Sequence, residues 1–235
     1  MAATMENPIV FYDLADANNK PWGAANIRVV SAIYPTRYAS IKVKSTTADP
    51  SADPDGEPTY VSDSFKIALY LDDKYPAPEH PAIFSPGTRG LQSLLVSEYF
   101  PTLISVIVPL SVPCLPRILD SRSIEYIRRT RGTSLISESA PKEIEPKLLK
   151  EAQQKFEALL GSLALNNESG PFVMGNQVSF IDFCIGGLFE FVQRSDTEDS
   201  TIFKELLSWS DGKLAVYWER IKQIERASSE INVET

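Results

Sequence analysis

The stretch Thr59-Tyr-Val-Ser-Asp-Ser-Phe-Lys-Ile-Ala-Leu-Tyr-Leu-Asp-Asp-Lys-Tyr-Pro76 reads as a short strand, a sharp turn and a helix. Its first three residues are typical of strands. Asp63 and Ser64 follow as N-cap residues, because their side-chain oxygens can accept hydrogen bonds from the free amides of a first helical turn. Apolar residues then recur at helical spacing until Pro76, which ends the run.

A junction of this kind supports two readings. The free backbone N–H groups and the positive end of the helix favour an anion, while an exposed carboxylate beside them favours an ammonium group. The same Asp63-Ser64 pair is also what an ordinary helix cap looks like. The residues of the junction alone leave both readings open.

The pattern Val61-Ser-Asp-Ser-Phe-x-Ile-x-x-Tyr-Leu71 resembles the glutathione-binding junction of the glutathione transferases. In that family an acid-Ser pair holds the γ-glutamyl end of glutathione, which is a zwitterion. By matched position, Asp63 would face its α-amino group and Ser64 its α-carboxylate. The resemblance also implies that Trp22 contacts glutathione. Glutathione would act as a co-substrate, and the electrophile would be the second substrate.

A second motif lies in Phe172-Val-Met-Gly-Asn-Gln-Val-Ser-Phe-Ile-Asp-Phe-Cys184. Ser179 and Asp182 are three residues apart, so the hydroxyl can reach the N3 amide and the carboxylate can reach back, as in a capping box. This is folding chemistry rather than catalysis. It also resembles the buried capping motif of the helical domain of glutathione transferases, and both motifs occur in the order of that family.

The resemblance implies an α/β plus all-α fold: a thioredoxin-like domain over residues 1–76 and a helical bundle over 87–235, joined by a Pro-rich linker. Strands are predicted at Pro8–Leu14, Tyr38–Lys44 and Thr59–Val61, with a helix over 24–32. Compared with the family pattern β-α-β-α-β-β-α, the first domain is incomplete. A second helix and the strand led by a cis-proline have no counterpart before Thr59.

The helical half is predicted from apolar periodicity. A long helix begins at Pro86 and is kinked by Pro101 and Pro109. Further helices are expected over Asp120–Thr130 and Pro146–Leu165, and Ile202–Ile224 forms one or two terminal helices that carry Trp209 and Trp218.

Four stretches resemble the fungal class related to bacterial β-etherases: Phe11-Tyr-Asp, Lys20-Pro-Trp22, Ser62-Asp-Ser-Phe-Lys-Ile-Ala-Leu-Tyr-Leu-Asp72 and Glu125-Tyr-Ile-Arg-Arg-Thr-Arg131. Members of that class are wood-decay fungal enzymes that bind aromatic compounds. The resemblance therefore implies a cytoplasmic homodimer that conjugates glutathione to hydrophobic or aromatic electrophiles, or cleaves aromatic ethers, in the detoxification of wood-derived aromatics.

Catalysis requires a donor that stabilises the glutathione thiolate near the start of the first helix. Related fungal enzymes carry a serine after Pro-Trp, and the matched position here is Gly23. Asn26 is the nearest polar side chain, although an Asn in a first turn is usually a local cap. Tyr99, Phe100 and Tyr126 are candidates for contacting an aromatic substrate between the domains, although aromatic residues at helical spacing are more often core.

Composition argues against other classes. The 235 residues carry a net charge of −8, so no basic stripe displaces counterions from a nucleic acid. The single histidine, His80, leaves no metal cluster to propose, and Cys114 and Cys184 are expected to be buried free thiols. The start of the chain lacks the pattern of a secretory signal, and prolines interrupt the apolar run Leu103–Leu119, so no membrane span is expected.

Three hypotheses remain from the sequence. The first is an active transferase. The second is a non-catalytic protein of the same fold that binds hydrophobic ligands, which would account for Gly23. The third is a product of a gene model or splice form that lost coding sequence between Ser31 and Pro58. The transcript across codons 31–58 distinguishes the third from the other two.

Overall fold

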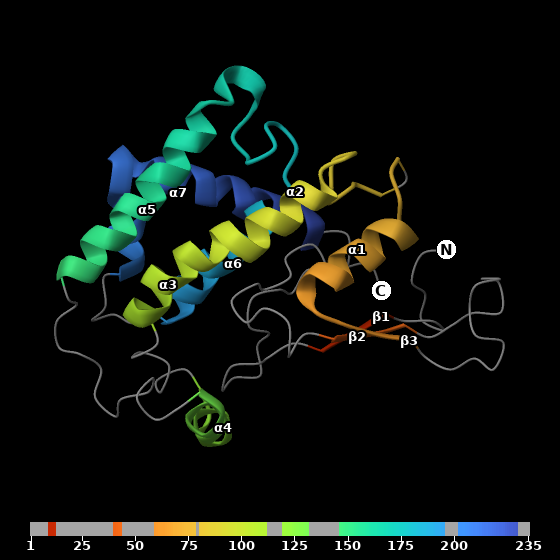
Figure 1. Ribbon diagram of the computed structural model, residues 1–235, viewed down its shortest axis with the longest axis horizontal. Coiled ribbons are helices and arrows are strands. Elements are labelled where there is room, and N and C mark those ends of the chain that lie inside the picture. The colour runs from red at the N-terminus through yellow and green to blue at the C-terminus, as the bar shows by residue number, and fades with distance from the viewer. Residues whose placement is uncertain are drawn as a thin grey trace.

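The structure is a computed structural model that describes residues 9–12, 40–43, 59–78, 80–111, 119–131, 146–195 and 202–229. Three strands come first, followed by helix α1 against them and then a group of helices (Figure 1). The predicted helix over 24–32 lies outside the described residues.

The sheet contains β1 (Ile9–Tyr12), β2 (Ser40–Val43) and β3 (Thr59–Ser62) in the order β1-β2-β3. Both pairs are antiparallel, with Ile9 opposite Val43 and Val43 opposite Thr59. A β-α-β crossover makes its two strands parallel. β2 is therefore not the second strand of such a unit with β1, although the order strand, helix, strand in the sequence suggested one.

Helix α1 (Ser64–Lys74) lies over the sheet and has two buried faces (Figure 1). Ile67 and Leu71 form a small core with Val61 at the end of β3. Ala68 instead belongs to the core of the helical part, and the half-buried Phe65 packs against that same core. Helix α1 therefore packs against both the sheet and the helices that follow. These two contacts fix the position of the N-terminus of α1.

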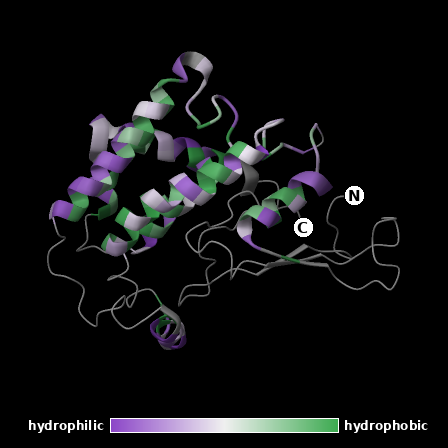
Figure 2. Cartoon of the chain, in the orientation of Figure 1, coloured by the Kyte–Doolittle hydropathy of each residue, from purple (hydrophilic) through white to green (hydrophobic). Residues whose placement is uncertain are grey.

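The second part contains, in chain order, α2 (Arg89–Leu94), the π-helical segment η1 (Leu95–Tyr99), α3 (Phe100–Ser111), α4 (Ser121–Arg131), α5 (Pro146–Ala164), the 3₁₀ turn η4 (Asn167–Ser169), α6 (Phe180–Ser195) and α7 (Ile202–Ser229). Most have an apolar stripe, whereas α4 is largely hydrophilic (Figure 2), and its Ile127 packs against the helical core. The fold is thus α/β plus all-α, as the sequence predicted.

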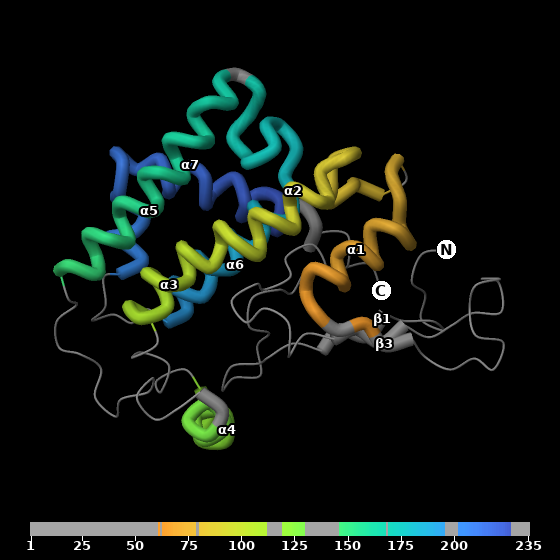
Figure 3. The backbone as a smooth tube through the Cα atoms, viewed as in Figure 1, coloured from red at the N-terminus to blue at the C-terminus, as the bar shows by residue number. Residues whose placement is uncertain are grey.

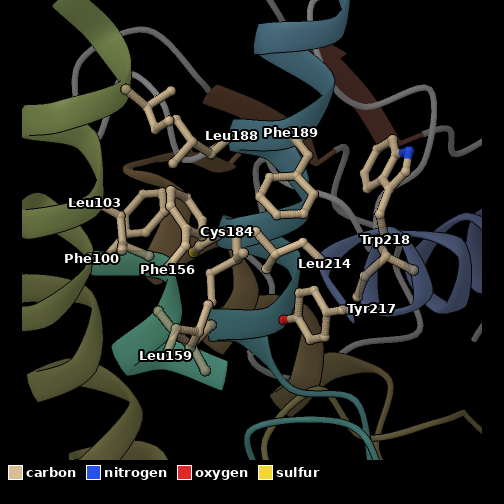
Figure 4. Packing of buried hydrophobic residues seen from close by; sticks show 14 of the residues in the cluster. Phe100, Leu103, Phe156, Leu159, Cys184, Leu188, Phe189, Leu214, Tyr217 and Trp218 are labelled. Atoms are coloured by element: carbon tan, nitrogen blue, oxygen red, sulfur yellow. The ribbon is translucent and has the colours of Figure 1, made fainter. Parts of the chain in front are cut away.

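Helix α6 is the centre of this group, because 13 of its 16 residues are buried. A helix that is apolar all round must be enclosed by other elements. α3 and α7 pack on it, and Phe100, Phe156 and Phe189 meet beside Cys184 (Figure 4). A Cβ built at Gly186 would come within 2.8 Å of Ile221 Cγ2, so α7 approaches the backbone of α6 closely.

The long helix predicted from Pro86 begins at Arg89 and continues to Ser111 as α2, η1 and α3, one continuous rod in Figure 3. Pro101 has no N–H, and its ring would clash with the carbonyl of Ser97 in a regular α-helix. The π segment Leu95–Tyr99 contains that carbonyl and widens the turn directly before the proline. The irregularity therefore lies just ahead of Pro101, while Pro109 stays inside α3.

Arg89–Ser111 is also long and apolar enough, by length and composition, to cross a membrane. A core helix passes the same test. The six buried residues of α3 include Leu103, Ile107 and Leu110, which are part of the helical core. The α3 part of this rod therefore packs in the helical core.

The start of α6 contains a buried polar cluster around Asp182. The Asp182 carboxylate is fully buried and accepts four hydrogen bonds: from Ser179 N (2.9 Å), Ser179 Oγ (2.6 Å), Val173 N (2.9 Å) and Tyr217 Oη (2.8 Å). Burial raises the pKa of Asp182, and the donors from Ser179, Val173 and Tyr217 oppose that rise. Asp182 therefore joins the turn before α6, the start of α6 and α7.

Half of the capping box differs from the prediction. The Asp182 carboxylate does reach back to the Ser179 amide, but the Ser179 hydroxyl donates to that carboxylate instead of capping N3. A first-turn amide is capped from elsewhere: Ile181 N donates to Oε1 of Gln92, a buried residue of α2 (3.0 Å). The cap of α6 is thus partly supplied by a residue 89 positions earlier in the chain.

We predict a large stability loss for Asp182→Ala. A cap alone is worth about 1–2 kcal/mol. The substitution leaves several buried donors without an acceptor, so we expect about 3–5 kcal/mol, measured by urea unfolding.

Asp120→Ala is the matched control. Asp120 is the exposed cap of α4 and accepts from Ser123 N and Ser123 Oγ (both 2.9 Å). Water can replace it at those donors, so its removal should cost much less than that of Asp182. Equal losses in the two variants would show that Asp182 is only a cap.

Candidate functional site

The candidate site is the junction between β3 and α1. Asp63 Oδ1 accepts from Phe65 N (2.9 Å) and Lys66 N (3.1 Å), and Asp63 O accepts from Ile67 N (2.8 Å). Asp63 therefore caps α1, as one of the two readings of the sequence predicts. These three bonds occupy the first-turn amides of residues 65–67, and the amide of Ser64 takes no part in them.

The backbone of Asp63 is unusual, with φ 91° and ψ 122°. A positive φ of this kind costs a non-glycine residue roughly 1–3 kcal/mol and is found mainly where the surrounding structure enforces it, often at binding sites. The Asp63 side chain is half-buried. Its second oxygen, Oδ2, has no hydrogen-bond partner among the described residues and is available to an ammonium group.

Ser64 is the first residue of α1 and is 4% exposed. Within the described part of the chain, neither its N–H nor its hydroxyl is hydrogen-bonded. Two donors and the positive end of an eleven-residue helix therefore lie beside one free carboxylate oxygen. This arrangement suits an anion and a cation held side by side, as in the α-carboxylate and α-amino group of an amino acid.

The start of α4 provides an internal comparison, because it also carries an Asp-Ser pair, Asp120-Ser121. Both carboxylate oxygens of Asp120 are occupied, Oδ1 by Ser123 N and Oδ2 by Ser123 Oγ. Asp120 does not share the positive φ of Asp63. Asp120 shows what an ordinary cap looks like in this chain, and the junction at Asp63 differs from it in backbone and in its free oxygen.

The linker after α1 is attached at both ends. Asp72 accepts from Ile83 N and from Arg89 Nη2 (both 2.9 Å), and Arg89 also pairs with Asp73 (2.6 Å). These bonds to Asp72 and Asp73 raise the pKa of Arg89. Gln177, in the turn before α6, accepts from Ser85 Oγ and donates to Ala82 O.

The predicted aromatic contacts are not brought together. Phe100 is 2% exposed and lies beside Leu103 and Phe156 in the helical core (Figure 4), so the structure gives it a packing role instead of a place in a cleft. Tyr99 is half-buried, and burial raises its pKa. Tyr126 is on α4, and Arg129 lies over its ring at 5.8 Å. The structure therefore defines no aromatic cleft from these three residues.

The residues proposed near the glutathione thiol, Trp22, Gly23 and Asn26, lie outside the described residues, as does Cys114. Cys184 is a buried free thiol whose pKa burial raises well above its ordinary value. His80 is half-buried and meets the ring of Tyr75 edge-on at 5.2 Å. In the described part of the chain, no three His, Cys, Asp or Glu residues are grouped to hold a metal ion.

Sequence reasoning missed the aromatic contacts behind the junction. The ring of Phe65 lies edge-on to Phe84 of the linker (5.4 Å between centroids) and to Phe180 of α6 (5.3 Å). Phe84 and Phe180 stack on each other at 5.7 Å. The signal available was only that Phe65 and Phe180 each follow a capping motif directly.

The chain matches known proteins over most of its length. The family model described as glutathione S-transferase, C-terminal domain, matches residues 90–223. The glutathione S-transferase-like protein ustS of Aspergillus flavus is 26% identical over 165 residues, which cover 66% of this chain and 58% of that protein. The chain thus spans less than two thirds of the length of this curated relative.

Two solved structures are similar. The glutathione transferase GSTFuA3 from Phanerochaete chrysosporium has a TM-score of 0.68 at 24% identity, covering 92% of this chain and 96% of that one. The glutathione S-transferase CsGST83044 of Ceriporiopsis subvermispora, solved in complex with glutathione, has a TM-score of 0.59 at 26% identity, covering 74% and 69%. At 24% identity, the similarity to GSTFuA3 concerns the fold alone. Because the family model covers more than half of its residues, this chain belongs to the glutathione S-transferase family.

Proposed function

We propose that this glutathione transferase-like protein binds glutathione at the start of α1 and presents it to hydrophobic or aromatic molecules. The observation that carries the proposal is that Asp63 Oδ2 lies beside the N–H and hydroxyl of Ser64, and that none of these three groups has a hydrogen-bond partner among the described residues. Asp63 would accept from the α-amino group of the γ-glutamyl end, and Ser64 would donate to its α-carboxylate.

Two further points support glutathione as the ligand. The similar protein CsGST83044 was solved with glutathione. The internal comparison with Asp120 favours binding over capping as the reason for the unusual backbone of Asp63. The proposal extends to conjugation of hydrophobic electrophiles or cleavage of aromatic ethers, to detoxification, and to a cytoplasmic homodimer, as expected for the fungal class that the sequence resembles.

The second candidate is a non-catalytic binder of hydrophobic ligands with the same fold. Gly23 favours it, because glycine has no hydroxyl where related enzymes carry serine. In this reading Asp63 and Ser64 still hold glutathione, but the thiol lacks a donor. The two candidates therefore share the binding site and differ in whether the thiolate is stabilised.

We predict that Ser64→Ala weakens glutathione binding. The variant loses one hydrogen bond to a carboxylate, worth about 1.5–3 kcal/mol, so the Kd measured by calorimetry should rise about tenfold or more. Ser121→Ala removes the matched hydroxyl at the ordinary cap of α4 and should leave the Kd unchanged. Equal affinity of Ser64→Ala and the parent protein would refute the assignment.

We also predict weak turnover in the natural protein. Losing a charge-assisted hydrogen bond to the thiolate raises the thiol pKa by roughly one to two units, which lowers the reactive fraction at neutral pH. Steady-state conjugation of a generic electrophile should be slow, and Gly23→Ser should increase it.

Turnover like that of an intact transferase would favour the active enzyme over the non-catalytic binder. In that case Asn26→Ala shows whether the amide of Asn26 replaces the missing hydroxyl. Binding of a fluorescent hydrophobic probe to the same samples serves as the control for a preserved ligand site.

A further inference from the structure

We infer that Phe65 is a positioning residue for the γ-glutamyl end of glutathione, and that it acts by anchoring Asp63 and Ser64 to the start of α6. The inference rests on the function proposed above.

The backbone of Phe65 orients the carboxylate of Asp63. Phe65 N donates to Asp63 Oδ1 at 2.9 Å, the shorter of the two bonds to that oxygen. This bond occupies Oδ1, which leaves Oδ2 for the ligand. Because Asp63 also has a positive φ, the orientation of its carboxylate depends on how firmly the next residues are held.

The ring of Phe65 holds these residues in place. It packs against both Phe84 and Phe180, edge-on to each at interplanar angles of 72° and 82°, and those two rings stack on each other. Edge-to-face pairs stabilise beyond the area that they bury, and they restrict the orientation of the ring. The backbone of Phe65 is therefore fixed by contacts on two other segments of the chain.

The two residues against which Phe65 packs, Phe84 and Phe180, lie in segments that are themselves held by hydrogen bonds. Phe180 directly follows Ser179, which bonds twice to the buried Asp182. Ile181 N is bonded to Gln92 of α2 at 3.0 Å. Phe84 sits in the linker between two attachments, Ile83 N to Asp72 and Ser85 Oγ to Gln177. The cluster around Asp182 therefore connects to the binding junction through Phe180 and Phe65.

If Phe65 only packs against its neighbours, replacing it would lower stability without changing which ligand the folded protein prefers. A positioning role predicts a selective effect at one end of glutathione. Asp63 and Ser64 are proposed to contact only the γ-glutamyl part, so a misplaced junction should weaken binding of glutathione but not of cysteinylglycine, which lacks that part.

The experiment compares the full chain with Phe65→Leu, which keeps an apolar side chain but removes both edge-to-face contacts. We expect glutathione to bind roughly threefold to tenfold more weakly, with the affinity for cysteinylglycine unchanged. In any measurable conjugation, the KM for glutathione should rise while kcat stays the same. Phe84→Leu removes only one of the two contacts and should cause a smaller change in the same direction, which also covers the case that Phe65→Leu fails to fold.

Phe156→Leu is the matched control. Phe156 also has two aromatic partners, Phe189 at 5.7 Å and Trp209 at 6.0 Å, but they belong to the core of α5, α6 and α7. This variant should lose stability and keep its preference for glutathione over cysteinylglycine.

The outcomes separate the two proposals. If the parent protein binds glutathione no better than cysteinylglycine, both the proposed function and the role of Phe65 are wrong. If the parent shows the preference and Phe65→Leu keeps it in full, only the positioning role is overturned. Loss of preference in Phe156→Leu as well would show that any core defect disturbs the junction, and would likewise overturn a specific role for Phe65.

Discussion

The buried carboxylate of Asp182 is the interaction on which the rest of the structure depends. It is shielded from water, and its desolvation is offset by four donors from three separate segments: the turn before α6, the cap of α6 and α7. Since α6 is enclosed on nearly all sides, the position of its first turn determines where α3 and α7 pack. The same first turn presents Phe180 to α1. This buried polar cluster thus sets the geometry of both halves.

The two Asp-Ser pairs show how one sequence pattern serves two purposes. At Asp120 both carboxylate oxygens bond to the local chain, and the pair is complete without a ligand. At Asp63 the backbone has a costly positive φ, and within the described part of the chain one carboxylate oxygen and the two donors of Ser64 have no partner. Strain of this kind is retained when the neighbouring structure enforces it, and we propose that Phe65 with its two aromatic partners does so.

Local patterns predicted the helices and strands well, because apolar spacing and capping motifs depend on residues that are close in the sequence. The strand and helix around Asp63, the helix after Asp120 and the family itself were predicted correctly. Contacts between distant residues were not predictable in this way. Nothing near Ser179 indicates that Gln92 caps α6, and apolar periodicity does not distinguish Phe100, a core residue, from an aromatic residue in a cleft. The antiparallel β1-β2 pair likewise depends on a long-range partner.

The central claim is that the junction at Asp63 and Ser64 is a glutathione site, and a crystal structure of the protein with glutathione tests it most directly. The account predicts the γ-glutamyl carboxylate at about 2.7–3.2 Å from Ser64 N and Oγ, with the ammonium group at a similar distance from Asp63 Oδ2. Glutathione bound elsewhere, or an Asp63 with both oxygens bonded to the chain as in Asp120, would contradict it.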